Sequence, residues 1–387
     1  MLSTPLQPSA PSARRIASID ALRGLVMLLM LVDHTREFFF IHAQVADPMD
    51  LSRTEPALFF TRLSAHLCAP VFVALTGVSA WLYGQNAKPG ADGASAFLFK
   101  RGLFLVVLEL TLVNFAWTFS LAPELVYLQV IWAIGLSMIA LSALIRLPRP
   151  ALIAVGLVIV LGHNLLDPVT VPKGAPGHAL WAILHDRGFI DLPWGGQART
   201  SYPILPWIGV AALGYGIGPW FKLEAAPRRQ RLLVLAAGAL ALLAVLRASN
   251  LYGDPTPWTA GATPLLTVMS VLNVTKYPPS ADFLLLTLGV GALLIVALER
   301  TPSRLTAILA AFGGAPLFFY LVHLYGLHLL NLFALAALGP NHGEAFSVPN
   351  VASIWLLAAL VAIPCGFATH GFGDLKRRSG QAWMKYL

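Results

Sequence analysis

Apolar stretches long enough to cross a lipid bilayer recur along the whole chain of 387 residues. A helix needs about 20 mainly apolar residues to cross the hydrocarbon core, because each residue advances the helix by about 1.5 Å. Only 11% of the residues are charged, whereas soluble domains carry about 25%. The sequence therefore predicts an all-α, polytopic integral membrane protein. About ten transmembrane helices are expected, at residues 17–42, 57–84, 97–119, 125–146, 150–167, 203–221, 231–250, 281–299, 305–337 and 350–370.

The ninth of these stretches is longer than one span requires. Pro316 follows Gly313 and Gly314 within it. Because proline removes a helix hydrogen bond, we expect the helix to break near these residues.

Three regions are expected along the chain. A disordered cytoplasmic tail, rich in proline and serine, covers 1–15, a membrane-embedded domain covers 16–370, and a basic cytoplasmic tail covers 371–387. Cys68 and Cys365 both lie within expected spans. Neither a disulfide framework nor a cysteine-based metal site is therefore expected.

Positively charged residues gather at alternate junctions between the expected spans, for example at 100–101 and 228–231. This arrangement follows the positive-inside rule, under which Lys and Arg stay on the cytoplasmic side. It predicts a cell (inner) membrane protein with both termini in the cytoplasm. The net charge of +8 is thus explained by the orientation of the chain in the membrane, and nucleic acid is not an expected partner. The long loops 43–56, 168–202 and 251–280 would lie outside, where we expect a cavity to open.

The first expected span carries an unusual polar stripe. Arg23 lies near its beginning, and Asp33, His34 and Arg36 lie toward its end. A charged group at the bilayer centre costs about 2.5–3.5 kcal/mol, so such groups are usually retained for a pathway or a reaction. The 11 residues from Arg23 to His34 return the helix to nearly the same face, about 16 Å further along.

Further polar groups lie at the outer ends of the first two spans. Asp33 and Arg36 are three residues apart and can pair, and the second span presents Arg62 and His66 four residues apart. If these spans are neighbours, His34 and His66 would face one cavity, as general-base chemistry requires. His42 lies near the water boundary, where an interfacial role is the stronger interpretation.

Glu109 lies in the middle of the third span. A carboxylate at that depth indicates either a specific proton-handling role or a structural partner such as Arg or His, and both interpretations stay open. Asn114 and Gln129 add polar edges that could also join helices. His323 and His328 are five residues apart and do not share a helix face. No spacing of the histidines predicts a metal site.

Several of these motifs resemble the heparan-α-glucosaminide N-acetyltransferase-like membrane acetyltransferases, within the wider transmembrane acyltransferase superfamily. The likeness covers nearly the whole chain from about residue 16. Its most specific part is Leu22-Arg23-Gly24 with His34 ten residues later, which is similar to the signature of the O-acyltransferase relatives. Cys68-Ala-Pro-Val-Phe-Val-Ala-Leu-Thr-Gly77 resembles the segment that the family has on its second span. Asn114, Leu128-Gln129 and Tyr320-Leu-Val-His323 also have similar-looking counterparts.

The resemblance leaves two histidines open as the catalytic base. In the O-acyltransferases the residue matching His34 is catalytic. The heparan-modifying members have Asn at that position, a catalytic His nearer His42, and Asp at the position of His66. We favour His34, because its spacing from Leu22-Arg23-Gly24 matches without a gap.

The resemblance implies transfer of an acetyl group from cytosolic acetyl-CoA to a sugar or glycan acceptor on the extracytoplasmic side, with no metal. The expected catalytic residues are His34, Asp33, His66 and His42, with Asp33 or His66 orienting His34. The residues expected to bind substrate or acetyl-CoA are Arg23, Arg36, Arg62, Glu109, Asn114, Gln129 and His323. A homodimer is one assembly open to such a protein. The alternative function is a proton-coupled transporter or flippase, with Glu109 and the histidines as a proton relay.

Overall fold

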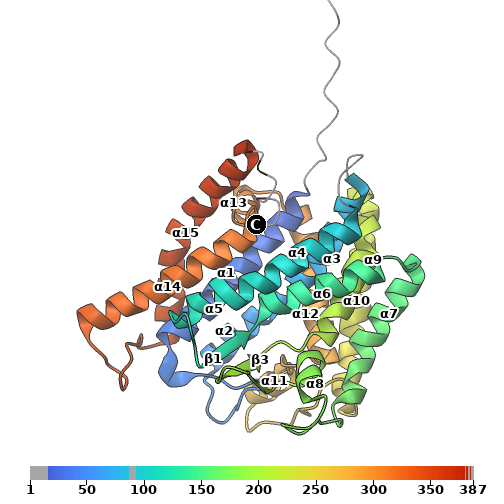
Figure 1. Cartoon of the computed structure of the whole chain (residues 1–387). Helices are drawn as coiled ribbons and strands as arrows, with labels where there is room; N and C mark the ends of the chain where they lie inside the picture. The colour runs from blue at the N-terminus through green and yellow to red at the C-terminus, as the bar shows by residue number, and fades with distance from the viewer. Residues whose placement is uncertain (1–15, 87–92, 380, 382–383, 385–387) are drawn as a thin grey trace, which may run out of the picture.

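Helices account for most of the described chain, which comprises residues 16–86, 93–379, 381 and 384 of a computed structural model (Figure 1). The expected tail 1–15 lies outside the described residues. The mainly helical architecture agrees with the sequence prediction. Cys68 and Cys365 are both buried and unpaired.

A long central helix, α1 (Ala17–Phe39), carries the polar stripe. It packs against α12 (Ala281–Arg300), α13 (Arg304–Phe312), α14 (Pro316–Leu338) and α15 (Val351–Ser379). The first helix of the chain is therefore packed among helices from the C-terminal part of the sequence. The predicted break is confirmed, because α13 ends at Phe312 and α14 begins at Pro316.

A second group of helices extends the bundle on the other side of α3. The close pairs in this group are α4 with α6, α3 with α9, α7 with α9, and α10 with α12. Their bounds are Cys68–Asn86 for α3, Ala94–Leu108 for α4, Val130–Leu144 for α6, Arg149–Gly162 for α7, Leu205–Ile217 for α9 and Ala225–Ser249 for α10.

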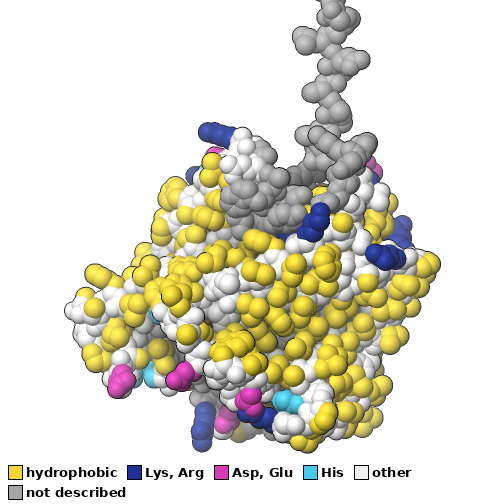
Figure 2. All heavy atoms as spheres, in the orientation of Figure 1, with side chains coloured by type: hydrophobic (Ala, Val, Ile, Leu, Met, Phe, Trp, Pro, Cys, Tyr) yellow, Lys and Arg dark blue, Asp and Glu magenta, His cyan; other side chains and the backbone are white. Residues whose placement is uncertain are grey.

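Within the described residues, six helical segments are long and apolar enough to cross a membrane. They are Pro56–Gln85, Arg149–Leu166, Ala225–Ser249, Ala281–Arg300, Pro316–Leu338 and Val351–Ser379. Figure 2 shows hydrophobic side chains over the broad side of the molecule, with charged side chains gathered toward its two ends. That distribution is typical of a protein whose surface faces lipid around its middle.

Two expected spans are less regular than the sequence indicated. The second consists of α2 (Pro56–Ser64), a 3₁₀ turn at Ala65–Leu67, and then α3. The third continues from α4 into a π-helical turn at Glu109–Val113 and ends with α5 (Asn114–Thr118). Such π turns insert one extra residue into a helix and are frequent at functional sites.

The beginning of the fourth expected span is a strand rather than a helix. Residues Leu125–Leu128 form β1, which pairs in parallel with β3 (Gln197–Thr200), and β3 pairs antiparallel with β2 (Phe189–Asp191). Local sequence could not indicate this pairing, because the partners are about 70 residues away in the chain. The sheet lies with α8 (His178–Leu184) and α11 (Pro264–Leu272) at the lower end in Figure 1.

Gly24 and Gly313 allow an unusually close approach of α1 and α13. A Cβ atom on Gly24 would lie 1.8 Å from the Leu309 carbonyl oxygen, and one on Gly313 would lie 1.9 Å from the Asp20 carbonyl oxygen. Only glycine fits at such a distance. The glycine of the Leu22-Arg23-Gly24 motif therefore has a packing role.

Candidate active site

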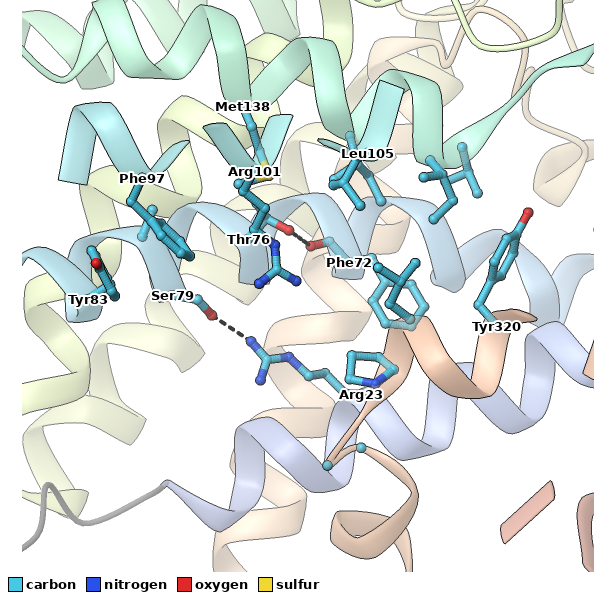
Figure 3. A pocket seen from close by; sticks show the side chains of 18 of the residues that line it. Arg23, Phe72, Thr76, Ser79, Tyr83, Phe97, Arg101, Leu105, Met138 and Tyr320 are labelled. Carbon is cyan, nitrogen blue, oxygen red and sulfur yellow. Dashed lines mark hydrogen bonds between the residues drawn. The ribbon is translucent and has the colours of Figure 1, made fainter. Parts of the chain in front are cut away.

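A cavity of about 350 Å³ lies between α1, α3, α4, α6 and the α13–α14 turn. The residues that line the cavity include both positively charged and apolar side chains. Arg23, Arg101 and Lys376 supply positive charge, while Phe72 and Leu105 belong to its apolar wall. In Figure 3, Tyr320 lies at one end of the labelled side chains, beyond Phe72 and Leu105 as seen from Arg23.

Arg23 is positioned at the cavity by contacts on two helices. Its Nη2 donates a hydrogen bond to the Ser79 hydroxyl at 2.5 Å, and its Nη1 lies 3.2 Å from the Asp20 carboxylate. Asp20 is one turn away on the same helix, so the pair holds the guanidinium against α1. Thr76 lies on the same face of α3, about one turn before Ser79, and also lines the cavity (Figure 3).

His34 and His323 form a close pair beside Tyr320, with His323 buried and His34 partly buried. The His34 Nδ1 and the His323 Nε2 are 2.7 Å apart, and the His323 Nδ1 is 2.8 Å from the Phe319 carbonyl oxygen. A carbonyl can only accept, so the His323 Nδ1 carries its proton, and the neutral ring accepts at Nε2. His34 must then donate from Nδ1. Its Nε2 keeps the lone pair that a base or a nucleophile needs.

Two further polar groups lie beside the His34 ring. The ring centroid of His34 is 5.2 Å from that of Trp117 and 5.9 Å from that of Tyr320. The Tyr320 hydroxyl and the Trp117 Nε1 are buried and face each other, and neither has another hydrogen-bond partner among the described residues. Buried donors with unused hydrogen-bonding capacity are candidates for holding a substrate oxygen. Sequence reasoning did not single out Trp117, and it named Tyr320 only as part of the motif Tyr320-Leu-Val-His323.

Asp33 is bound by two arginines. The Arg36 Nε lies 3.1 Å from one carboxylate oxygen and the Arg62 Nη1 lies 2.8 Å from the other. The expected Asp33–Arg36 pairing is therefore present. However, the hydrogen-bonded partner of His34 is His323, whereas we had expected Asp33 or His66.

His66 is more completely buried than a base that faces a substrate would be. Its ring packs on Phe283, it is 1% exposed, and both its nitrogens lack a hydrogen-bond partner among the described residues. Asp47, in the loop 43–56, accepts a hydrogen bond from the Lys276 backbone at 3.1 Å. Burial raises the pKa of Asp47, while the charges of Arg62 and Lys276 oppose that rise. Lys276 is itself 3% exposed.

Glu109 caps a helix that begins inside the membrane region. Its Oε2 accepts a hydrogen bond from the Trp132 backbone at 3.0 Å, in the first turn of α6. The first backbone N–H groups of a helix have no partners within it, and the helix dipole favours a negative group there. The partner of Glu109 is thus a helix start, whereas the structural interpretation left open from the sequence had named an Arg or His.

Asn114 and Gln129 belong to the same structural arrangement. The Asn114 amide donates to the Glu109 and Tyr127 carbonyl oxygens at 2.7 and 2.8 Å, and its Oδ1 accepts from the Tyr127 backbone at 2.7 Å. Gln129 is the residue that precedes α6. These contacts join the π turn to β1, and the Glu109 carbonyl oxygen accepts from both the backbone and the side chain of Asn114.

His42 lies apart from the cavity, at the surface beyond the end of α1. It is exposed, its Nδ1 lies 2.8 Å from the Ser347 hydroxyl, and its ring stacks on His342 at 4.0 Å. Burial of part of the ring, and secondly the charge of the neighbouring His342 imidazole, lower the pKa of His42. Of the two rival histidines, His34 is the one beside a cavity-lining residue.

A family model described as heparan-alpha-glucosaminide N-acetyltransferase, catalytic, matches residues 15–251. The match covers more than half of the chain. The chain belongs to this family. No curated protein matches the chain. Membership confirms the family suggested by the sequence and identifies the chain as a member of a membrane acetyltransferase family, for which an acetyl-CoA-type donor and a glycan acceptor are the general expectation. The matched residues include Arg23 and His34, whereas Tyr320, His323 and Lys376 lie beyond them.

Proposed function

We propose that this protein transfers an acetyl group from cytosolic acetyl-CoA to a sugar or glycan acceptor on the extracytoplasmic side of the cell (inner) membrane. In this proposal the chain crosses the bilayer about ten times, with both termini in the cytoplasm. The observation that carries the proposal is the cavity. It brings the cations Arg23, Arg101 and Lys376 and the side chain of Tyr320 to one space, and the Tyr320 ring contacts His34.

The cationic part of the cavity suits the phosphates of coenzyme A. Guanidinium groups bind phosphate through paired hydrogen bonds, and an ammonium group adds a point charge. The apolar wall between Arg23 and Tyr320 suits the flexible pantetheine arm, which would bring the thioester toward His34. The axial distance of about 16 Å between Arg23 and His34 on one helix is comparable with the reach of that arm.

His34 would act as the general base. Its Nε2 would take the proton from an acceptor hydroxyl or amine while the oxygen or nitrogen attacks the thioester carbonyl. A new C–O or C–N bond forms, the C–S bond breaks, and the imidazolium returns the proton to the departing thiolate. His323 would hold the His34 Nδ1–H throughout. Direct attack by the His34 Nε2, which forms an acetyl-histidine intermediate, is a variant that uses the same geometry.

The thioester carbonyl needs donors as its oxygen becomes negative. The Tyr320 hydroxyl and the Trp117 Nε1, which lie beside the His34 ring and face each other, are suited to that task. Donors held in place in a water-poor site lower the barrier strongly.

The test is acetyl transfer by the purified protein. CoA release from acetyl-CoA is measured with and without a hexosamine acceptor, for the unaltered protein and for the variants His34→Ala and His42→Ala. Loss of a general base typically lowers the rate about 10²–10⁴-fold, and we expect that loss in His34→Ala alone. Full activity of a variant carrying both substitutions would refute the assignment.

The alternative of a proton-coupled transporter or flippase gains no support from Glu109. The carboxylate binds the start of α6, so it has a structural partner, and a mobile proton is not needed to explain it. Ion-coupled flux in proteoliposomes without an acyl donor would favour this alternative.

A further inference from the structure

Two histidines and an aspartate from separate segments meet at the outer end of α7. His163 and Asp167 flank a 3₁₀ turn (His163–Leu166) that follows α7, and His185 follows α8. His163 and His185 are 2% and 1% exposed, while Asp167 is partly exposed. One ligand atom from each residue lies within 4.8 Å of the others. This cluster is separate from the acetyl-transfer residues.

Both ring nitrogens of His185 lie beside oxygen atoms. Its Nδ1 lies 3.3 Å from the Asp186 carboxylate, which can only accept a hydrogen bond. Its Nε2 lies 3.1 Å from the His163 carbonyl oxygen and 3.4 Å from the Asp167 carboxylate. The His185 Nε2 and the Asp167 carboxylate therefore lie side by side as two potential metal ligands.

His163 provides a second, independent observation. Neither of its ring nitrogens has a hydrogen-bond partner that meets the usual distance and angle among the described residues, although the Pro279 carbonyl faces the ring. A buried imidazole with a free lone pair is costly unless a ligand takes that lone pair. A metal ion would use the lone pair of each ring as well as the Asp167 carboxylate.

We infer that His163, Asp167 and His185 form a site for a divalent transition metal ion, with Zn²⁺ the best match. Two imidazoles and one carboxylate are a ligand set that Zn²⁺ commonly takes, with water in the fourth position. The outer hydrogen bonds also suit a metal site. Asp186 orients His185, and the Asn164 amide donates to the second oxygen of Asp167 at 2.9 Å. Tetrahedral ligands about 2.1 Å from zinc lie about 3.4 Å apart, so the three side chains would draw together on binding.

The metal would join three parts of the outer end of the bundle. His163 and Asp167 hold the end of α7, and His185 belongs to the loop that leads into β2. The Asn164 Oδ1 accepts a hydrogen bond from the Ala281 backbone at 2.8 Å, at the start of α12. Zinc binding would therefore stabilise the long outer loop 168–202, and it has no part in the proposed acetyl transfer.

The experiment measures zinc binding directly. The full chain is purified in detergent through a tag without histidine, stripped with a chelator, and titrated with Zn²⁺ against a chromophoric competitor. We expect one ion bound at submicromolar dissociation constant and a higher unfolding temperature with Zn²⁺. Both effects should be lost or weakened at least tenfold in His163→Asn and in Asp167→Asn. His342→Asn, at the exposed His42–His342 stack, is the matched control and should bind like the unaltered protein.

Two results would overturn the proposal. One is a stripped protein that does not bind Zn²⁺ at submicromolar dissociation constant, because the three side chains would then not form a metal site. The other is binding that survives in both His163→Asn and Asp167→Asn, or that disappears in His342→Asn, because the ion would then lie elsewhere. Folding of each variant is checked by size-exclusion elution without metal, and two independent substitutions keep the test decisive if one of them fails to fold.

Discussion

At the scale of single residues, the hydrogen bonds of one histidine determine the chemistry of another. The His323 Nδ1 donates to the Phe319 carbonyl within its own helix, and this leaves only its Nε2 to accept from His34. The reactive nitrogen of His34 is thereby assigned without reference to a substrate. Sequence reasoning found both histidines, but the contact joins residues 289 positions apart and no local pattern records it.

We predict that His323→Ala impairs transfer without removing the base. The His34 Nδ1–H loses its acceptor, so the ring can turn and change tautomer. The maximal rate should fall about 10-fold or more, by less than in His34→Ala, with little change in KM for acetyl-CoA, and the pH–rate profile should shift. The readout is initial CoA release from pH 5.5 to 9. Glutamine can also accept from Nδ1, so His323→Gln should recover part of the rate. An unchanged pH profile in His323→Ala would argue against a positioning role.

Arg23 provides a prediction about the donor. If the cavity binds coenzyme A phosphates, Arg23→Gln should raise KM for acetyl-CoA roughly 10-fold or more, because a charge-assisted hydrogen bond contributes about 1.5–3 kcal/mol. Acetyl-pantetheine, which lacks the nucleotide and its phosphates, should be used equally well by the variant and the unaltered protein. Steady-state kinetics with both donors separate the cases. Equal loss with both donors would indicate damage to the fold.

At the scale of elements, α1 and α13 meet through two glycines. We predict that Gly24→Ala destabilises the protein by about 1–3 kcal/mol, because its new methyl group would meet the Leu309 carbonyl and force the helices apart. The control is Gly326→Ala in α14, where a new methyl group meets nothing within 4 Å, so higher helix propensity should leave stability equal or raised by up to about 1 kcal/mol. Thermal unfolding in detergent compares them, and similar curves for the two variants would contradict the packing argument.

Several elements depart from the sequence prediction for a shared reason. The apolar residues of β1 have the composition of a span, yet they pair with β3 in the loop expected outside. Asn114 and Glu109 make this arrangement possible by bonding the strand and the start of α6. Polar groups buried among helices form hydrogen bonds with residues that are close in space but distant in the sequence. For the same reason, the spacing of the histidines gave no sign of the cluster of His163, Asp167 and His185.

At the scale of the whole molecule, both ends of the described chain lie at the upper side in Figure 1, while the sheet lies at the lower side. An even number of membrane crossings produces such an arrangement. We predict that Ser52→Cys reacts with a membrane-impermeant maleimide in intact cells, whereas Ala226→Cys reacts only after the membrane is opened. The native cysteines are buried and should label weakly. The reverse labelling pattern would place the termini outside and contradict the donor path from the cytoplasm.

The sequence by itself determined the membrane class, the break before Pro316, the family and the two histidines that compete for the role of base. Those features depend on hydropathy, on proline geometry and on motifs within one helix, which are local properties of a chain. Only the tertiary structure decided that His323 is the partner of His34, that Tyr320 links it to the cavity of Arg23, and that Glu109 caps α6. The physical reason is that buried polar groups must be satisfied, and the group that satisfies each of them is contributed by whichever helix packs beside it.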